Sequence, residues 1–285
     1  MYRLTELAIP FFALMIALET FFAVRHEKNY DRKDVWTNIG LGFGSVGFGA
    51  VFGLIQAFVY TFIYDNIAPF QMPMNLWWAW LILLFVDDFV YYWFHRVSHE
   101  VRLFWNFHVV HHSSNQYNLS VAVRQSWFSG IIQWTFYVTP AFFGFPFWAF
   151  VTMHGANLLY QFWIHTKVVK KMPAWFEYIF NTPSHHRVHH GVNDEYQDKN
   201  YAGIFIFWDR MFGTFVDEKE EVRYGITTPL TSYNPLWINS HAWAETWTAM
   251  KTKQTLRGKM RCLFGAPAMN FEEKILLNSN AEKQI

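Results

Sequence analysis

Three spaced histidine clusters constrain this chain of 285 residues more than any other feature of its sequence. Eleven of the thirteen histidines fall between positions 95 and 190, where the clusters read HRVSH, HVVHH and HHRVHH in chain order. Imidazole is the commonest neutral metal ligand, and it suits iron, zinc, copper and nickel. Because the clusters hold more histidines than one ion can use, the pattern predicts a fold that gathers them around two metal ions.

The composition is typical of a membrane protein. Hydrophobic residues make up 52% of the chain, aromatic residues 21% and charged residues only 16%, whereas an ordinary soluble domain is about 25% charged. A net charge of +1 gives no reason to expect nucleic-acid binding. The single cysteine, Cys262, excludes an internal disulfide framework and a cysteine-based zinc or iron–sulfur site. The metal ligands must therefore be histidines, with or without carboxylates.

Four apolar stretches are candidates for the bilayer. A span needs about 20 mostly apolar residues, and residues 7–24, 39–64 and 76–94 each meet this requirement. A fourth stretch, residues 128–165, is interrupted by proline and glycine. Its length suits either two helices joined by a tight turn or a hairpin that only dips into the bilayer. We expect an all-α, polytopic membrane protein with four to five transmembrane or re-entrant helices and a cytoplasmic, histidine-rich helical cap.

Loop charges orient these stretches. The loop after the first stretch carries four basic residues, whereas residues 65–75 contain no lysine or arginine. The positive-inside rule then places residues 25–38 in the cytoplasm, and alternation along the chain brings all three histidine clusters to the same cytoplasmic face. The membrane would be the bacterial inner membrane, or the endoplasmic reticulum in a eukaryotic cell.

One domain is expected over residues 1–285, because the clusters must share one site. Its parts are membrane helices (7–94), the first two clusters (95–126), the membrane hairpin (127–165), the third cluster and cap (166–239), and a polar, helical tail with fraying ends (240–285).

Helical spacing predicts how the clusters share two ions. His95 and His99 are four residues apart, as are His108 and His112, so each pair lies on one side of a helix. On a helix the side chain of His111 points about 100° away from that of His112, so His111 can reach a second ion. The third cluster repeats this arrangement with His186, His189 and His190.

Other polar residues in or near these segments admit more than one role. Asp88 lies within an apolar stretch, where a carboxylate is costly; it either orients a ligand imidazole or pairs with a basic residue on another helix. Glu100 is a ligand, a supporting group or a solvated residue. His165, where the hairpin re-emerges, is a ligand candidate, and His185 is either a ligand or a supporting group. His154 is either a structural histidine or a buried ligand, and we favour the structural role.

His26 and His241 stand outside the pattern, and we expect both to be ordinary surface residues.

The clusters resemble the fatty acid hydroxylase superfamily of integral-membrane, di-iron, O2-dependent enzymes, which includes sterol desaturases. The motifs HRVSH, HVVHH and HRVHH occur here in that order. A closer likeness over residues 85–215, including the strings DDFVYYWFHRVSHE and NTPSHHRVHHGVNDEYQDKNY, is to its ether-lipid-cleaving members, the alkylglycerol monooxygenases. The resemblance implies hydroxylation of the carbon next to an ether oxygen, release of a fatty aldehyde, and electrons from a tetrahydrobiopterin. Many bacterial members act on other lipids.

The resemblance also implies roles for single residues. His165 matches the histidine of the family's WIHT segment and is expected to bind metal. Glu100, Asp198, Asn200 and Tyr201 match acidic and DKNY positions and are expected to be catalytic. The implied iron ligands are His95, His99, His108, His111, His112, His186, His189 and His190.

The implied partners are a lipid substrate, O2, the membrane and an electron donor. The donor is either a pterin or a separate redox protein, since the chain has no haem-binding HPGG segment.

Three other functions compete with this interpretation. A hydroxylase or desaturase of a fatty acyl, sterol or ornithine lipid would differ only in substrate. A metal transporter would place its ligands near the midplane on discontinuous helices, whereas these clusters follow the ends of apolar stretches. A zinc hydrolase needs only about three protein ligands, far fewer than the clusters offer.

Overall fold

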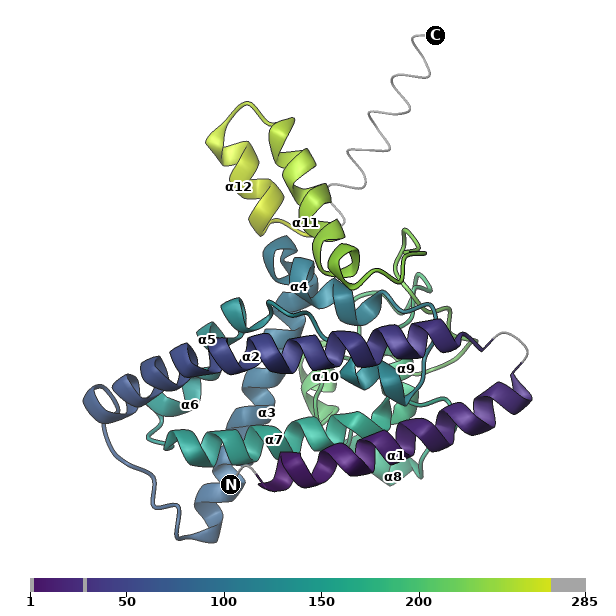
Figure 1. Ribbon diagram of the computed structural model, residues 1–285. Coiled ribbons are helices and arrows are strands. Elements are labelled where there is room, and N and C mark those ends of the chain that lie inside the picture. The colour runs from purple at the N-terminus through teal and green to yellow at the C-terminus, as the bar shows by residue number, and fades with distance from the viewer. Residues whose placement is uncertain (1–2, 28–29, 268–285) are drawn as a thin grey trace.

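The computed structural model describes residues 3–27 and 30–267, with side chains from residue 8 onward (Figure 1). Within this part the chain is helical and has only two isolated β-bridges, Phe180 to Phe205 and Gly191 to Tyr224, so the all-α prediction is confirmed there. The helices are α1 (Arg3–His26), α2 (Arg32–Asn66), α3 (Trp77–Glu100), α4 (Arg102–His112), the 3-10 helix η1 (Leu119–Val123), α5 (Gly130–Tyr137), α6 (Thr139–Phe142), α7 (Phe147–Ile164), α8 (Ala174–Ile179), α9 (Pro183–His189), α10 (Phe207–Phe212), α11 (Pro235–Lys251) and α12 (Leu256–Phe264).

Two helices of the described chain are long and apolar enough to cross a membrane, by length and composition: Ala8–His26 in α1 and Arg32–Asn66. The second begins earlier than expected, because the Asp31 carboxylate accepts the backbone N–H groups of Lys33 and Asp34 and so starts α2 there. The expected third span lies in α3. The hairpin contains α5 and α6, which are eight and four residues long, so only α7 has the length of a span in that region. A total of four to five spans remains a prediction.

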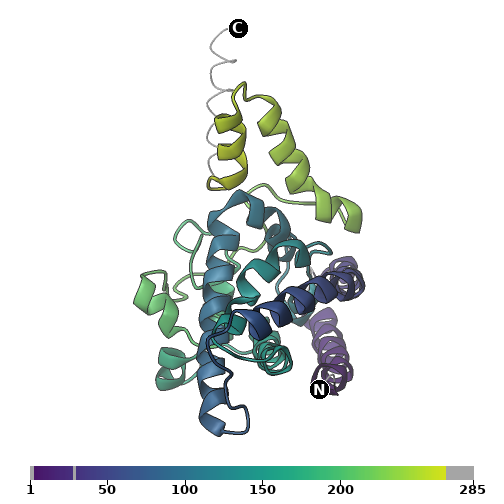
Figure 2. The ribbon, with the colours of Figure 1, turned by 90° about the vertical axis from the view of Figure 1, so that its left-hand side faces the viewer.

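The long helices enclose the histidine clusters. In Figure 1, α1, α2 and α7 run across the view while α3 stands steeply against them, and Figure 2 shows α3 upright from the side. The end of α3 leads directly into α4, and α11 and α12 project beyond α4 as a hairpin in both views. The expected helical tail is thus observed as two helices up to Phe264, while residues 268–285, where fraying was expected, lie outside the described residues.

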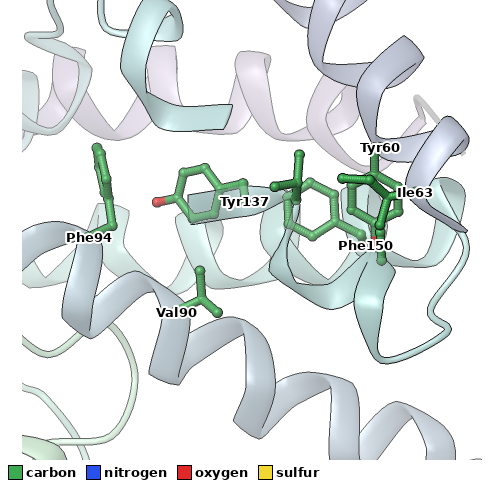
Figure 3. Packing of buried hydrophobic residues seen from close by; sticks show 8 residues of the cluster. Tyr60, Ile63, Val90, Phe94, Tyr137 and Phe150 are labelled. Atoms are coloured by element: carbon green, nitrogen blue, oxygen red, sulfur yellow. The ribbon is translucent and has the colours of Figure 1, made fainter. Parts of the chain in front are cut away.

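A cluster of buried side chains joins α2, α3, α5, α6 and α7, and it extends to Phe94, which directly precedes His95 (Figure 3). Tyr60 stacks on Phe150, with ring centroids 5.2 Å apart, and its hydroxyl donates to the Phe145 carbonyl at 3.0 Å. Burying each such side chain stabilises the fold by about 1.5–3 kcal/mol. The hairpin turns at Gly144, where φ is +75° and a Cβ atom would lie 2.2 Å from the Phe70 carbonyl oxygen, so only glycine fits.

Candidate metal centre

The ends of four helices carry the clustered histidines. Because α3 continues past the apolar stretch, His95 and His99 lie one turn apart on the same helix. The second cluster occupies the last turns of α4. The third lies on α9, which begins with Pro183 at its first position, where the fixed φ of proline favours a helix start. His165 and His190 are the C-cap residues that directly follow α7 and α9.

Nine histidines gather in two groups, and within each group the candidate ligand nitrogens lie within 4.8 Å of one another. His108 and His112, which are four residues apart on α4, fall in the same group. His111 falls in the other group, because its side chain points about 100° away from that of His112. Eight of the nine are buried and one is half-buried. The first group consists of His95, His99, His108, His112 and His189, and the second of His111, His165, His186 and His190.

Backbone carbonyl groups fix the orientation of four of these rings. His95 donates from Nδ1 to the Tyr201 carbonyl at 2.7 Å, and His189 donates from Nδ1 to the Lys199 carbonyl at 2.9 Å. In the second group, His111 donates from Nδ1 to the carbonyl of Arg124 at 3.1 Å, and His165 to that of Gln161 at 2.8 Å. Metal-binding histidines almost always donate their second ring N–H in this way. The network therefore leaves the Nε2 lone pair of each ring free for a metal.

The contact between His111 and His165 shows that this arrangement fits a cation. Their Nε2 atoms lie 3.2 Å apart, and both rings carry their proton on Nδ1, so two lone pairs face each other. Neighbouring imidazole nitrogens bound at about 2.1 Å from one metal ion lie about 3.0–3.4 Å apart. A cation between the rings turns this repulsion into coordination. The corresponding Nε2 distances between His186 and His165 and between His95 and His108 are 2.9 Å and 3.0 Å.

Burial keeps the ligand candidates on α4 and α9 uncharged. It lowers the pKa of His111 to about 4, and it also lowers the pKa values of His112, His186 and His189 well below the usual value. Removing an imidazolium from water is costly, so the neutral form is favoured. Neutral imidazole is the form that binds a metal, and both groups are therefore ready to coordinate at neutral pH.

The segment from Asp198 to Tyr201 lies behind the first group, on the side of the Nδ1 atoms. The Asp198 carboxylate is 3.5 Å from Nδ1 of His99, and the Tyr201 carbonyl accepts from His95. Asp198 and Asn200 adopt positive φ values of 57° and 54°, which bend this loop sharply. The Asn200 side chain bonds the carbonyls of His185 and Val216 at 3.1 and 2.7 Å. These contacts give the segment a means of positioning the ligands.

Asp88 makes contacts that neither expectation anticipated. Its carboxylate accepts the backbone N–H groups of Ile204 and Phe205 at 2.7 and 3.0 Å and the indole N–H of Trp208 at 3.0 Å. Among the described residues, its hydrogen-bond donors are the Asn157 amide and these three N–H groups, with no ligand imidazole and no basic side chain. Asp88 instead ties α3 to the loop that follows Tyr201, and it orients His95 only through that loop.

Glu100 and His185 both lie outside the two groups. Glu100 is exposed and accepts from Arg96 Nε at 2.8 Å, which corresponds to the solvated alternative. The His185 ring lies against Phe215, with centroids 5.4 Å apart. Burial lowers the pKa of His185 to about 3.

The remaining three histidines have different surroundings. His154 donates from Nδ1 to the buried carboxylate of Asp87 at 3.1 Å. His26 is exposed, as expected. The expectation for His241 was wrong: it is buried at 5% exposure and donates from Nδ1 to the Ile238 carbonyl, because α11 packs against α4.

Arg124 is the most important supporting residue that the sequence analysis missed. This buried guanidinium donates to the carbonyl of Val110 at 2.7 Å and to the side chains of Asn38 and Ser113 at 2.7 and 2.8 Å. Asp34 lies 3.5 Å away. These bonds hold the carbonyl of Arg124 against His111. A lone arginine within the run SVAVRQS was the available signal, since a charge in apolar sequence calls for a buried partner.

A cavity of about 360 Å³ adjoins both groups. Each group contributes two histidines to its wall: His95 and His108 from the first, and His111 and His165 from the second. None of the described residues that line it is an aspartate, glutamate, lysine or arginine. The polar part of the wall consists of imidazole, amide and hydroxyl groups, and the rest is aromatic, aliphatic or glycine.

Comparison with known proteins agrees with the histidine pattern. Residues 80–214, which include every member of both groups, match the family model described as fatty acid hydroxylase. This segment is therefore similar to a fatty acid hydroxylase domain. It is 37% identical over 286 aligned positions to the alkylglycerol monooxygenase of Xenopus tropicalis, 39% over 262 to that of Homo sapiens, and 47% over 183 to that of Danio rerio.

These alignments cover 98%, 91% and 64% of this chain, but only 64%, 58% and 40% of the respective relatives. The chain therefore spans less than two thirds of the length of the curated relatives it matches. No solved structure is significantly similar to it.

Proposed function

We propose that this protein is a membrane-bound di-iron monooxygenase that uses O2 to hydroxylate the carbon next to the ether bond of an alkylglycerol-type lipid. The hydroxylated product is a hemiacetal, which collapses by breaking the carbon–oxygen bond to release a fatty aldehyde and glycerol. The similarity to three alkylglycerol monooxygenases supports this choice of substrate.

One observation carries the proposal: two groups of buried, neutral histidines open onto a single cavity. The first group would hold one iron ion and the second group the other, with the nine histidines named above as the ligands. When bound, the two ions supply the O2 activation that hydroxylation of an unactivated carbon requires.

The chain's own residues would prepare the site for this reaction. The carbonyls of Tyr201, Lys199, Arg124 and Gln161 hold ligand N–H groups and keep each Nε2 directed at its ion. Burial of the ligands excludes bulk water, which protects a reactive oxidant from side reactions. We assign positioning roles to Asp198, Asn200 and Tyr201, which lie behind the ligands.

The absence of Asp, Glu, Lys and Arg from the described cavity wall favours a neutral lipid. Away from the proposed iron ions, a phosphate, a free carboxylate or the zwitterionic head of an ornithine lipid would be buried without an opposite charge, and an unpaired buried charge is costly. The hydroxyl groups of an alkylglycerol can bond to amide and hydroxyl side chains such as Gln125 and Ser98 in the wall. A sterol is the neutral alternative, and it would share the metal chemistry.

Location and electron supply complete the proposal. We place α1 and α2 across the bilayer as two of several spans, with the histidine groups on the cytoplasmic side. The two electrons that the reaction consumes would come from a tetrahydropterin or from a separate redox protein.

Mass spectrometry of the products tests this function. Purified protein loaded with iron is given an alkylglycerol, O2 and a tetrahydropterin. His112→Ala serves as the inactive variant and exposed His26→Ala as its matched control. Fatty aldehyde from the unsubstituted protein and from His26→Ala, but not from His112→Ala, is the expected result. Hydroxylated sterol without any aldehyde would overturn the ether-lipid assignment and leave the metal site in place.

A further inference from the structure

Two glycines, Gly49 and Gly53, leave gaps on the face of α2 that borders the cavity, beside the Phe52 side chain, which also lines it. Gly49 and Gly53 both line the cavity wall, and a Cβ atom added to either would meet no atom within 4 Å. Ser45 and Gln56 lie on the same face, before and after them. From the first to the last of these four residues, α2 advances by about 16 Å. The cavity is therefore widened along three turns of the helix.

Other glycines of this region serve helix packing instead. A Cβ atom on Gly42 would lie 2.7 Å from the Val123 carbonyl oxygen, and one on Gly130 would lie 2.6 Å from Cβ of Phe52. These glycines allow close approach of the chain. Gly49 and Gly53 have no such neighbour, so a side chain added at either position would enter open space at the cavity wall that they line.

The widened wall leads away from the candidate metal ions. At one end, Gly42 of α2 contacts Val123, which precedes the Arg124 carbonyl that binds His111. At the other end, Tyr60 of α2 stacks on Phe150 near the start of α7. A molecule that extends from the histidines along α2 passes Gly49 first and Gly53 next.

We propose that Gly49 and Gly53 form the part of the cavity wall that contacts the alkyl chain of the substrate, and that they determine the longest alkyl chain that the cavity accepts. This inference rests on the proposed function. With the ether carbon held at the histidines, the chain lies along the glycine face of α2. A side chain at Gly53 would occupy the volume that the distal part of a long chain needs and would leave shorter chains unaffected.

Binding measurements on the metal-free protein test the inference without relying on turnover. The probe is a long-chain alkylglycerol with a photoreactive diazirine at the end of its chain, and unlabelled alkylglycerols of graded length compete with it. In Gly53→Leu we expect the long-chain competitor to weaken by about tenfold or more, since one methylene in an apolar pocket already discriminates by about 10–200-fold. The shortest competitor should keep its affinity, and Gly49→Leu should exclude still shorter chains.

Gly40 and Gly47 supply matched controls on the same helix. A Cβ atom on either also meets nothing within 4 Å, but these glycines share the opposite face with Phe43, Leu54 and Phe58, whose side chains are 74–75% exposed. Leucine there should not change the chain-length profile. Leucine favours a helix more than glycine does, so all four variants should fold.

Two outcomes overturn the inference in different ways. An unchanged chain-length profile in Gly53→Leu, or an equal shift in Gly47→Leu, overturns it while the proposed function stands. If the unsubstituted protein binds no alkylglycerol of any length, both the inference and the proposed substrate are wrong. Mapping of the diazirine adducts adds a second readout: the expected site is the segment of α2 between Ser45 and Gln56, and adducts confined to other helices contradict the proposal.

Discussion

Replacement of Asp88 by asparagine tests how the fold positions the first metal group. Its two carboxylate oxygens accept two backbone N–H groups and the Trp208 indole N–H. An amide has one oxygen, so one or two of these buried donors lose their acceptor, at about 1–3 kcal/mol each. We expect Asp88→Asn to destabilise the protein by about 1–6 kcal/mol. The loop that carries the Tyr201 carbonyl should then hold His95 less firmly.

The loss of that support should weaken the first metal site more than the second. Mutation of groups that orient ligands typically costs about 10–100-fold in metal affinity, and Asp88 supports the first group through the loop that carries the Tyr201 carbonyl. Its link to the second group is longer, because it runs through the side chains of Asn157 and Gln161 before it reaches His165. The second group is supported by the carbonyls of Arg124 and Gln161. Chelator competition measures the two affinities, and thermal unfolding in detergent measures stability. The exposed Asp65→Asn is the control. An equal loss of affinity at both sites, or none at either, would refute this reasoning.

Three further predictions concern the second group and its surroundings. The pKa of His111 is lowered from 6.5 to about 4 in the folded state, so the unfolded chain binds the proton more readily. In the metal-free protein His111 alone should cost about 3 kcal/mol of stability as the pH falls from 6.5 to 4, and the lowered pKa values of His112, His186 and His189 should add to this loss; a flat unfolding profile over this range would contradict the assignment. Arg124→Met should destabilise by about 3–5 kcal/mol because Asp34 is left as a buried, unpaired charge, and adding Asp34→Asn should restore part of the loss in the same assay. His185→Phe should retain both metal ions, since the ring faces Phe215 and lies outside both groups; elemental analysis showing one ion would make His185 a ligand.

The sequence predicted the arrangement of the histidines well because the relevant contacts are local. His108 and His112 lie one turn apart on any helix, and His111 must then face elsewhere. The same reasoning separates His189 from His186 and His190. The helices α1, α2, α3 and α7 followed equally from the long apolar stretches.

Long-range contacts could not be predicted in the same way. The partner of Asp88 is a backbone segment more than a hundred residues later, and no periodicity indicates such a contact. His241 resembled a surface residue in sequence, but α11 packs against α4 and buries it. Glu100 follows a ligand candidate directly and nevertheless points outward to Arg96, because successive residues on a helix face different directions.

The number of membrane spans could not be predicted from the sequence for a different reason. Interruption by proline and glycine was visible between residues 128 and 165, but it did not reveal how short α5 and α6 would be. Likewise, the pair of aspartates in α3 binds other parts of the protein, so an apolar window that contains them does not by itself establish a span.

Metal content per chain tests the central claim most directly. The protein is loaded anaerobically with Fe(II), freed of excess metal and analysed for iron, beside His165→Ala/His186→Ala, which removes half of the second group, and His26→Ala as control. We predict two iron ions per chain for the unsubstituted protein and for the control, and one for the double variant. A single ion in the unsubstituted protein, or two ions retained by the double variant, would contradict the two-group site.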